Sequence, residues 1–337
     1  MKLPTMFSNE PLHGSHPLPF PVSPERIPSL FRVTRFTYEQ IDHRTCRCEA
    51  AIYHDAMSLQ VAWEVRQPDI RLHPGVLVRV SWTGRPSSQD GFVRIARLAL
   101  SEIPMAGFDL FATVPSGWVK NRDLVERARA LTSRLSAAQL HLFNAIFWDG
   151  LRFHRFLSGP SSINGHHNVQ NGNFRHSIEV AERCLAVVAD EPRAAKDLLV
   201  LAALLHDAGK AEEYTFNRQR QCFEMSARGA LIGHRHTILE WIAAALARQR
   251  IDLPEGQRLG LLHCLTAANG ANFLGIRSPA SIEAVTLASV DGLSGKADLL
   301  MSHAPREAGF GRYHKHLGVR PYVVEGEGAG LMLTAAK

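Results

Sequence analysis

One apolar run that ends in two polar residues constrains this chain most: LLVLAALLHDAGK, residues 198–210. Its first eight residues are all apolar, so the helix predicted here has no polar face and belongs at the centre of a helical domain. A buried charge costs several kcal/mol unless something compensates it, and a metal ion commonly does so for an adjacent imidazole and carboxylate. His206 and Asp207 therefore indicate a metal site, and Gly209 is expected to end the helix.

The chain before Pro104 shows the period of β-strands instead. Short runs rich in β-branched and aromatic residues alternate with turn residues. Five strands are predicted, at LFRVTRFTY, CRCEAAIYH, SLQVAWEV, GVLVRVSW and GFVRIARLAL. Five is the strand count of the OB-fold, a small barrel that binds single-stranded nucleic acid on one face. The expected fold class is therefore multidomain, with an N-terminal five-stranded OB-like barrel followed by an all-α helical bundle.

Arginines interrupt the apolar positions of the barrel strands. They give two interpretations: the ordinary solvent face of a half-buried sheet, or a surface that attracts phosphates and stacks bases. The second interpretation predicts these substrate-binding residues: Arg32, Arg35, Arg79, Trp82 and Arg94.

The patterns divide the chain into five parts. The predicted domains are an extended N-terminal segment at 1–28, the barrel at 29–115, a helical linker at 116–160, the metal-binding helical domain at 161–302 and a Gly-rich basic tail at 303–337. A break between two helices is expected near Ser136, within the linker. The tail carries histidines that can touch phosphate or metal, although a loosely packed terminus is the simpler expectation.

Composition narrows the class of protein only a little. A net charge of +6 over 337 residues suits an anionic partner, but it also suits an ordinary solvated surface. The sequence shows neither an apolar run long enough for a membrane span nor a signal-peptide pattern at its start, so a cytoplasmic location is expected. The five cysteines show no C-x-x-C spacing, which argues against a disulfide framework or zinc ribbon. An oligomer remains possible.

Four segments offer metal ligands from separate predicted helices, which is how helical bundles build metal sites. Each histidine alone is explained as well by capping or solvation, and Asp291 alone can begin a helix. The candidate metal ligands are His176, His206, Asp207, His234 and Asp291, with His236 and His263 as further candidates.

The residues at this point resemble a known family. His176, the His206-Asp207 pair and Asp291 match the H…HD…D signature of the HD phosphohydrolase superfamily. More narrowly, INGHHNVQNGNFRHSIEVA, LLVLAALLHDAGKAEEY, GALIGHRHTILEWI and LASVDGLSGKADLL are similar, in order and spacing, to segments of YhaM-type 3′→5′ exoribonucleases. That family places an OB-fold before its HD domain, as the strand pattern predicts here.

The resemblance implies a ligand set. The first metal is expected on His176, His206, Asp207 and Asp291, and Asp207 is expected to bridge to a second metal held by His234. The family usually closes the second site with a histidine pair before a glycine, where this sequence has Ala268 and Asn269. This departure leaves three alternatives. His236 or His263 replaces the missing histidines as a ligand of the second metal, the enzyme uses a single metal, or the activity is lost.

The implied chemistry is metal-assisted hydrolysis of a phosphodiester. Asp207, Lys210 and His167 are the predicted catalytic residues, Lys210 by contacting phosphate and His167 by orienting substrate or a ligand. A lysine after a helix end is equally often only a partner of the helix dipole. The expected cofactor is one or two divalent ions, first of all Mn²⁺, with Mg²⁺, Fe²⁺, Co²⁺, Ni²⁺ and Zn²⁺ also suited to these ligands.

The leading hypothesis is a 3′→5′ exonuclease acting on single-stranded RNA, with DNA left open. Three alternatives remain: a phosphohydrolase of a small nucleotide, a non-catalytic protein that binds single strands, and a role in the processing of mobile-element DNA.

Overall fold

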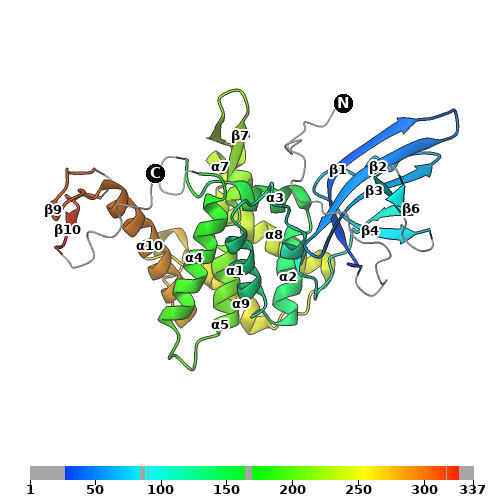
Figure 1. Ribbon diagram of the computed structural model, residues 1–337. Coiled ribbons are helices and arrows are strands. Elements are labelled where there is room, and N and C mark those ends of the chain that lie inside the picture. The colour runs from blue at the N-terminus through cyan, green and yellow to red at the C-terminus, as the bar shows by residue number, and fades with distance from the viewer. Residues whose placement is uncertain (1–26, 84–87, 90, 164–168, 316, 326–337) are drawn as a thin grey trace.

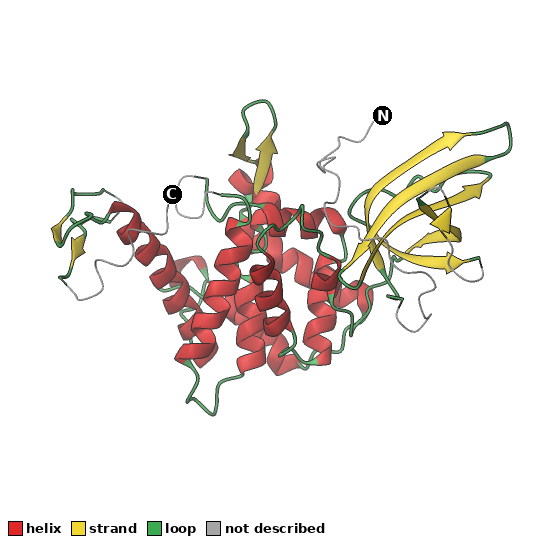
Figure 2. Cartoon of the chain, viewed as in Figure 1, coloured by secondary structure: helices red, strands yellow, loops and turns green. Residues whose placement is uncertain are grey.

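The computed structural model describes residues 27–83, 88–89, 91–163, 169–315 and 317–325. A β domain packs beside a larger helical domain, and a small β element follows the last helix at the opposite end (Figures 1 and 2). Most of the predicted N-terminal segment, residues 1–26, and the end of the predicted tail, residues 326–337, lie outside the described residues.

The β domain contains the five predicted strands. They are β1 (Phe31–Gln40), β2 (Cys46–His54), β3 (Met57–Val65), β4 (Leu77–Trp82) and β6 (Phe92–Leu100), with a short β5 (Ser88–Gln89) paired to β6. The sheet order is β3-β2-β1-β4-β6-β5, and β3 also pairs with β6 in parallel. These pairings join the five long strands in a ring around buried residues such as Val33, Ile52 and Ile95. The predicted five-stranded, OB-like domain is thereby confirmed.

The helical domain is built around α5 (Lys196–Leu205), whose residues from Leu198 onward are all buried. The other helices are α1 (Arg122–Thr132), α2 (Ala137–Phe147), α3 (Gly150–Ser158), α4 (Gly172–Val187), α6 (Lys210–Glu213), α7 (Ala227–Leu231), α8 (His234–Gln249), α9 (Glu255–Thr266) and α10 (Ile282–His303). Ser136 begins α2 with a capping box, because its hydroxyl accepts from the Gln139 N–H while the Gln139 side chain accepts from the Ser136 N–H. Helices α1 to α3 share one core with α4 and α5.

A hairpin interrupts the stretch that the sequence predicts to be helical throughout. Strands β7 (Tyr214–Asn217) and β8 (Cys222–Met225) pair antiparallel and project from the helical domain (Figure 1). The rings of Phe216 and Phe223 lie 5.1 Å apart across the pair. The side chain of Asn217 accepts hydrogen bonds from the backbone N–H groups of Gln219 and Arg220 and so closes the turn. Local strand pairing and this turn outweigh the helical pattern of the surrounding sequence.

Strands β9 (Gly309–Phe310) and β10 (Tyr322–Val323) form a small antiparallel pair after α10. Among the described residues, no helix has the length and apolar character that crossing a membrane requires.

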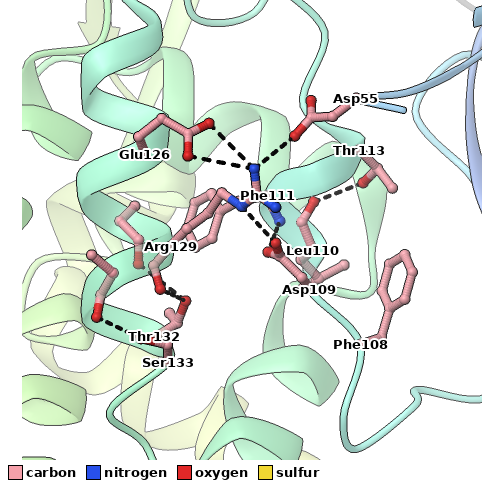
Figure 3. A network of polar contacts seen from close by, with 12 residues as sticks. Asp55, Phe108, Asp109, Leu110, Phe111, Thr113, Glu126, Arg129, Thr132 and Ser133 are labelled. Atoms are coloured by element: carbon pink, nitrogen blue, oxygen red, sulfur yellow. Dashed lines mark hydrogen bonds and ion pairs between the residues drawn. The ribbon is translucent and has the colours of Figure 1, made fainter. Parts of the chain in front are cut away.

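The two domains meet at a polar junction. Arg129 of α1 donates to Asp55 of the β2–β3 turn (3.0 Å), to Asp109 (2.7 Å) and to Glu126 (3.2 Å), as Figure 3 shows. Asp109 in turn caps the short 3₁₀ helix η2 (Leu110–Thr113). One arginine therefore ties the barrel to the start of the helical domain.

Arg32 of β1 lies at the same junction and is fully buried. Its guanidinium donates to the carbonyl of Gly75 (2.7 Å) and to the carbonyl and hydroxyl of Thr113 (3.1 and 2.9 Å). The charge also lies over the rings of Trp118 and Phe153, at 5.1 and 5.2 Å from their centroids. The junction thus surrounds a cation with neutral acceptors and aromatic faces.

Candidate metal centre

Side chains from three segments of the helical domain converge on one point. His176 comes from the first turns of α4, His206 follows α5, and Asp291 lies in α10. Their ligand atoms all lie within 4.8 Å of one another. The Nε2 atom of His176 is 3.1 Å from Asp291 Oδ1 and 3.4 Å from the Nε2 atom of His206. The chain therefore brings two imidazoles and a carboxylate to a common point.

Asp207 lies between this group and His234. Its Oδ2 atom is 3.5 Å from the Nε2 atoms of both His176 and His206, whereas its Oδ1 atom is 3.4 Å from the Nε2 atom of His234 at the start of α8. One carboxylate thus faces two sets of nitrogen atoms with its two oxygens. This is the arrangement that a bridging ligand requires.

Hydrogen bonds fix how two of the rings face the site. His206 Nδ1–H donates to the carbonyl of Ala203 (2.7 Å), and His234 Nδ1–H donates to Glu213 Oε2 (2.7 Å). Because each Nδ1 holds its proton for a hydrogen bond, each Nε2 presents a lone pair to the site. Glu213 was not among the predicted site residues, since nothing in KAEE distinguishes this buried carboxylate from its neighbour Glu212.

Charges at the site hold the carboxylates ionised. Burial alone would raise the pKa of Asp207, but Lys210 first, and then the histidines, outweigh burial and hold this pKa well below its usual range. Burial alone would likewise raise the pKa of Asp291, but its contacts with His176 and His206 outweigh burial and lower this pKa. Burial disfavours the charged form of His206, yet Asp207 and Asp291 together raise its pKa. The site therefore attracts positive charge.

The donor set fits a divalent ion. Imidazole nitrogens and ionised carboxylate oxygens suit manganese, iron, cobalt, nickel and zinc. Ligands that share one ion at about 2.1 Å stand about 3.0–3.4 Å apart at octahedral or tetrahedral angles. The nitrogen-to-oxygen distances of 3.1 Å (His176 to Asp291) and 3.5 Å (His206 to Asp291) are close to this spacing.

Gly209 serves the site in a different way from the one predicted. Helix α5 already ends at Leu205, and Gly209 has a right-handed backbone with φ of −61°. A Cβ atom at Gly209 would lie 2.2 Å from the carbonyl oxygen of His234. The glycine is needed because α8 approaches the backbone here, and this approach brings His234 to Asp207.

Lys210, a predicted catalytic residue, lies within the centre, where its Nζ atom is 2.5 Å from Asp207 Oδ2. The two further candidate ligands lie outside it. His236 is exposed and pairs with the carbonyl of Ile232 (3.1 Å), and the Nε2 atom of His263 accepts the N–H of Ala280 (2.9 Å). His167, the third predicted catalytic residue, falls outside the described residues.

The two positions that depart from the family pattern are Ala268 and Asn269. Asn269 is exposed, and Ala268 donates its N–H to the carbonyl of Arg277 (3.0 Å). Among the residues that the structure describes, Asp207 and His234 are the predicted ligands left for a second ion.

The barrel residues predicted to bind substrate differ in exposure. The prediction for Arg32 was wrong, because its buried guanidinium is enclosed at the junction and no strand on the surface can reach it. Arg35 and Arg79 are exposed, the first beside Gln60 (3.0 Å) and the second beside Met105 (3.5 Å). Trp82 and Arg94 are half-buried, and Trp82 packs against the barrel core.

Comparison with known proteins agrees with this geometry. The HD domain family matches residues 173–294, a range that includes every residue of the metal centre. The chain is also 27% identical over 146 residues to the 3′-5′ exoribonuclease YhaM of Bacillus licheniformis. That match covers 43% of this chain and 45% of the relative, so less than half of the relative is aligned. No solved structure matches the chain. The protein therefore contains an HD domain at residues 173–294 and is similar to YhaM.

Proposed function

We propose that this protein is a divalent-metal-dependent phosphodiesterase that shortens single-stranded RNA from its 3′ end. The position of Asp207 carries the proposal, because its two oxygens face His234 on one side and His176 with His206 on the other. A carboxylate in this position can hold one ion together with Asp291 and bridge to a second. The relative named above as an exoribonuclease supports the choice of RNA.

A divalent ion held here would polarise a phosphate oxygen and lower the pKa of a bound water, which supplies hydroxide at neutral pH. The protein's own residues prepare the site. Glu213 holds the His234 ring by its Nδ1 atom, and Ala203 holds His206 in the same way. Lys210 keeps an ammonium group beside Asp207, within reach of a phosphate that binds there. We assign Lys210 to phosphate binding and keep Mn²⁺ as the first ion to test.

Strand binding is assigned to the barrel. Arg35 and Arg79 expose guanidinium groups on its surface, and phosphate attraction of this kind is independent of sequence. With Arg32 excluded, these two residues are the accessible members of the predicted set, beside the half-buried Arg94 and Trp82.

The proposal is tested with 5′-labelled single-stranded RNA and DNA of the same sequence, in Mn²⁺, in Mg²⁺ and in chelator. We expect a ladder that shortens from the 3′ end in Mn²⁺ and is absent in chelator. Asp207→Ala should abolish it, because both groups of nitrogen atoms lose their shared ligand. His236→Ala is the matched control, since this exposed histidine lies outside the centre and its loss should leave the ladder unchanged.

Two results would contradict the proposal. Strand binding without cleavage in any metal would indicate a binding protein instead. Release of phosphate or nucleoside from mononucleotides, with no shortening of strands, would indicate a small-nucleotide phosphohydrolase. Circular dichroism of Asp207→Ala and calorimetric titration of wild type and His176→Ala with Mn²⁺ separate loss of metal from loss of fold.

A further inference from the structure

The C-terminal element forms a pocket at the end of α10. The pocket has a volume of about 740 Å³ and opens between the last turn of the helix and the β9–β10 pair. Figure 1 places this element at the end of the molecule opposite the barrel. The side chains that give the pocket its chemistry are His303, Phe310, Arg312, Tyr313, His314 and Arg320.

The lining combines cations with exposed aromatic rings. Arg312 and Arg320 supply guanidinium groups, and the rings of His303 and His314 lie 3.9 Å apart. Phe310 and Tyr313 are 64% and 65% exposed, so their rings are accessible to a ligand. The remaining lining residues are alanine, proline and glycine, so no carboxylate is found among the described residues of the pocket wall. Basic groups interleaved with aromatic rings are typical of surfaces that bind single-stranded nucleic acid.

The same chemistry disfavours a metal in this pocket. Within the described part of the chain, the group of side chains placed to hold an ion is the one at His176, His206 and Asp291. In the described part of the pocket wall, His303 and His314 lie beside arginines and aromatic rings and not beside a carboxylate that could complete a ligand set. Guanidinium groups bind phosphate instead, in a bidentate manner.

Helix α10 connects this pocket to the metal centre. It carries Asp291 and, twelve residues later, ends at His303 in the pocket wall. A rise of 1.5 Å per residue gives about 18 Å between these positions. That length corresponds to about five stacked nucleotides at 3.4 Å each.

We propose that this pocket binds a phosphate and a base of the same single strand whose 3′ end lies at the metal centre, about five nucleotides from that end. The inference rests on the proposed function and adds a second contact that the barrel does not provide. It makes affinity depend on strand length, since strands shorter than the separation cannot reach both places.

The test compares a 20-nucleotide RNA with a trinucleotide. Affinities are measured by fluorescence anisotropy in chelator, and cleavage rates are measured in Mn²⁺. Arg312→Gln and Tyr313→Ala alter exposed side chains of the pocket. Arg306→Gln is the matched control, since this exposed arginine lies in the same element but does not line the pocket.

For the 20-nucleotide strand, we expect Tyr313→Ala to raise Kd by about fivefold or more through loss of one stacked base. Arg312→Gln should also raise Kd and should reduce the slope of log K against log salt by about 0.7, which corresponds to one phosphate contact. Trinucleotide affinity, trinucleotide cleavage rate and every property of Arg306→Gln should stay within about twofold of wild type.

The assignment of the pocket would be overturned if Arg312→Gln and Tyr313→Ala lost as much affinity for the trinucleotide as for the 20-nucleotide strand. It would also be overturned if Arg306→Gln lost as much affinity as the two pocket variants. If the variants cleave and bind the long strand as wild type does, the pocket proposal falls while the nuclease proposal stands. If wild type neither binds nor cleaves either strand, the proposed function itself fails, and the pocket proposal falls with it.

Discussion

The metal centre and the barrel junction both remove charged groups from water, but they compensate these charges differently. Asp207 is buried beside one opposite charge, the ammonium group of Lys210 at 2.5 Å, and three histidines lie nearby. Arg32 is buried as completely, yet its partners are two backbone carbonyls, one hydroxyl and two aromatic rings. Burial lowers the pKa of Arg32 to about 9, since no carboxylate offsets it.

Access separates the two places further. The side chains of Asp291 and His234 are 38% and 27% exposed, so a ligand can reach the metal centre. Arg32 is 0% exposed. At the metal centre, a ligand can join or replace the groups that surround Asp207. At the junction, the groups that surround Arg32 are part of the packed fold and leave no room for a ligand. This difference predicts that substitutions at the junction act on stability and that those at the centre act on metal binding.

The largest effect is expected at the junction. Arg32→Ala leaves the carbonyls of Gly75 and Thr113 buried without their donor and opens a cavity, so it should lower the free energy of unfolding by about 3–5 kcal/mol. Urea unfolding followed by circular dichroism measures the loss. Arg79→Ala is the control, since this exposed arginine should change stability by less than about 0.5 kcal/mol. Similar values for the two variants would remove the distinction between an enclosed and an accessible arginine.

The second effect concerns pH and His154, which packs against Trp118 at the same junction. Burial, together with Arg155 and Arg32, lowers the pKa of His154 to about 4, against about 6.5 in an unfolded chain. The unfolded chain therefore binds the proton more readily, and the contribution of neutral His154 to stability is complete above about pH 6.5 and is lost as the pH falls towards 4. The gap between the two pKa values corresponds to about 3 kcal/mol.

Unfolding experiments at pH 7, 5.5 and 4 can isolate this contribution by comparing wild type with His154→Gln. Carboxylates titrate in both proteins, so the informative quantity is the difference between their two stability profiles. Wild type should lose up to about 3 kcal/mol more than the variant over this range. Parallel profiles would show that His154 is not held neutral by the junction.

The sequence predicted the two domains because hydrophobic period is a local property. Alternation identified β1 to β4 and β6, and the apolar run identified α5 as central. The same period placed Arg32 on the strand face opposite Phe31 and Val33, which fill the barrel. What covers that second face is Thr113, distant in sequence, together with Trp118 and Phe153. The local sequence pattern around Arg32 contains no information about contacts with such distant residues, so this enclosed arginine was predicted to lie on the surface.

The candidate site shows the same limit. His206 and Asp207 were predicted from desolvation alone, and His176, His234 and Asp291 as candidates on separate helices that the fold brings together. Glu213 was missed because its role depends on the start of α8, which reaches it only through the close approach at Gly209. The β7–β8 hairpin, which begins directly after Glu213, was missed because its short strands lie between helices.

The smallest effect tests whether Glu213 belongs to the metal centre or only to the fold. Glu213 accepts both the Nδ1–H and the backbone N–H of His234, and His234 in turn lowers the pKa of this buried carboxyl. Glu213→Gln keeps the shape but removes the charge that orients the ring and increases its basicity. Loss of such an outer partner typically weakens metal binding by about 10–100-fold.

Calorimetric titration with Mn²⁺ should show this loss in Glu213→Gln, while Glu224→Gln on the hairpin, whose carboxylate pairs with exposed Arg220, should bind as wild type does. The loss should fall on an ion held by Asp207 and His234, so a protein that binds two ions should keep its binding at His176, His206 and Asp291. If Glu213→Gln binds every Mn²⁺ ion with the affinity of wild type, the contact between Glu213 and His234 serves only the stability of the fold. The metal would then be held by His176, His206 and Asp291 with Oδ2 of Asp207. The other oxygen, Oδ1, would face His234 for stability alone, so one carboxylate would have a functional oxygen and a structural oxygen.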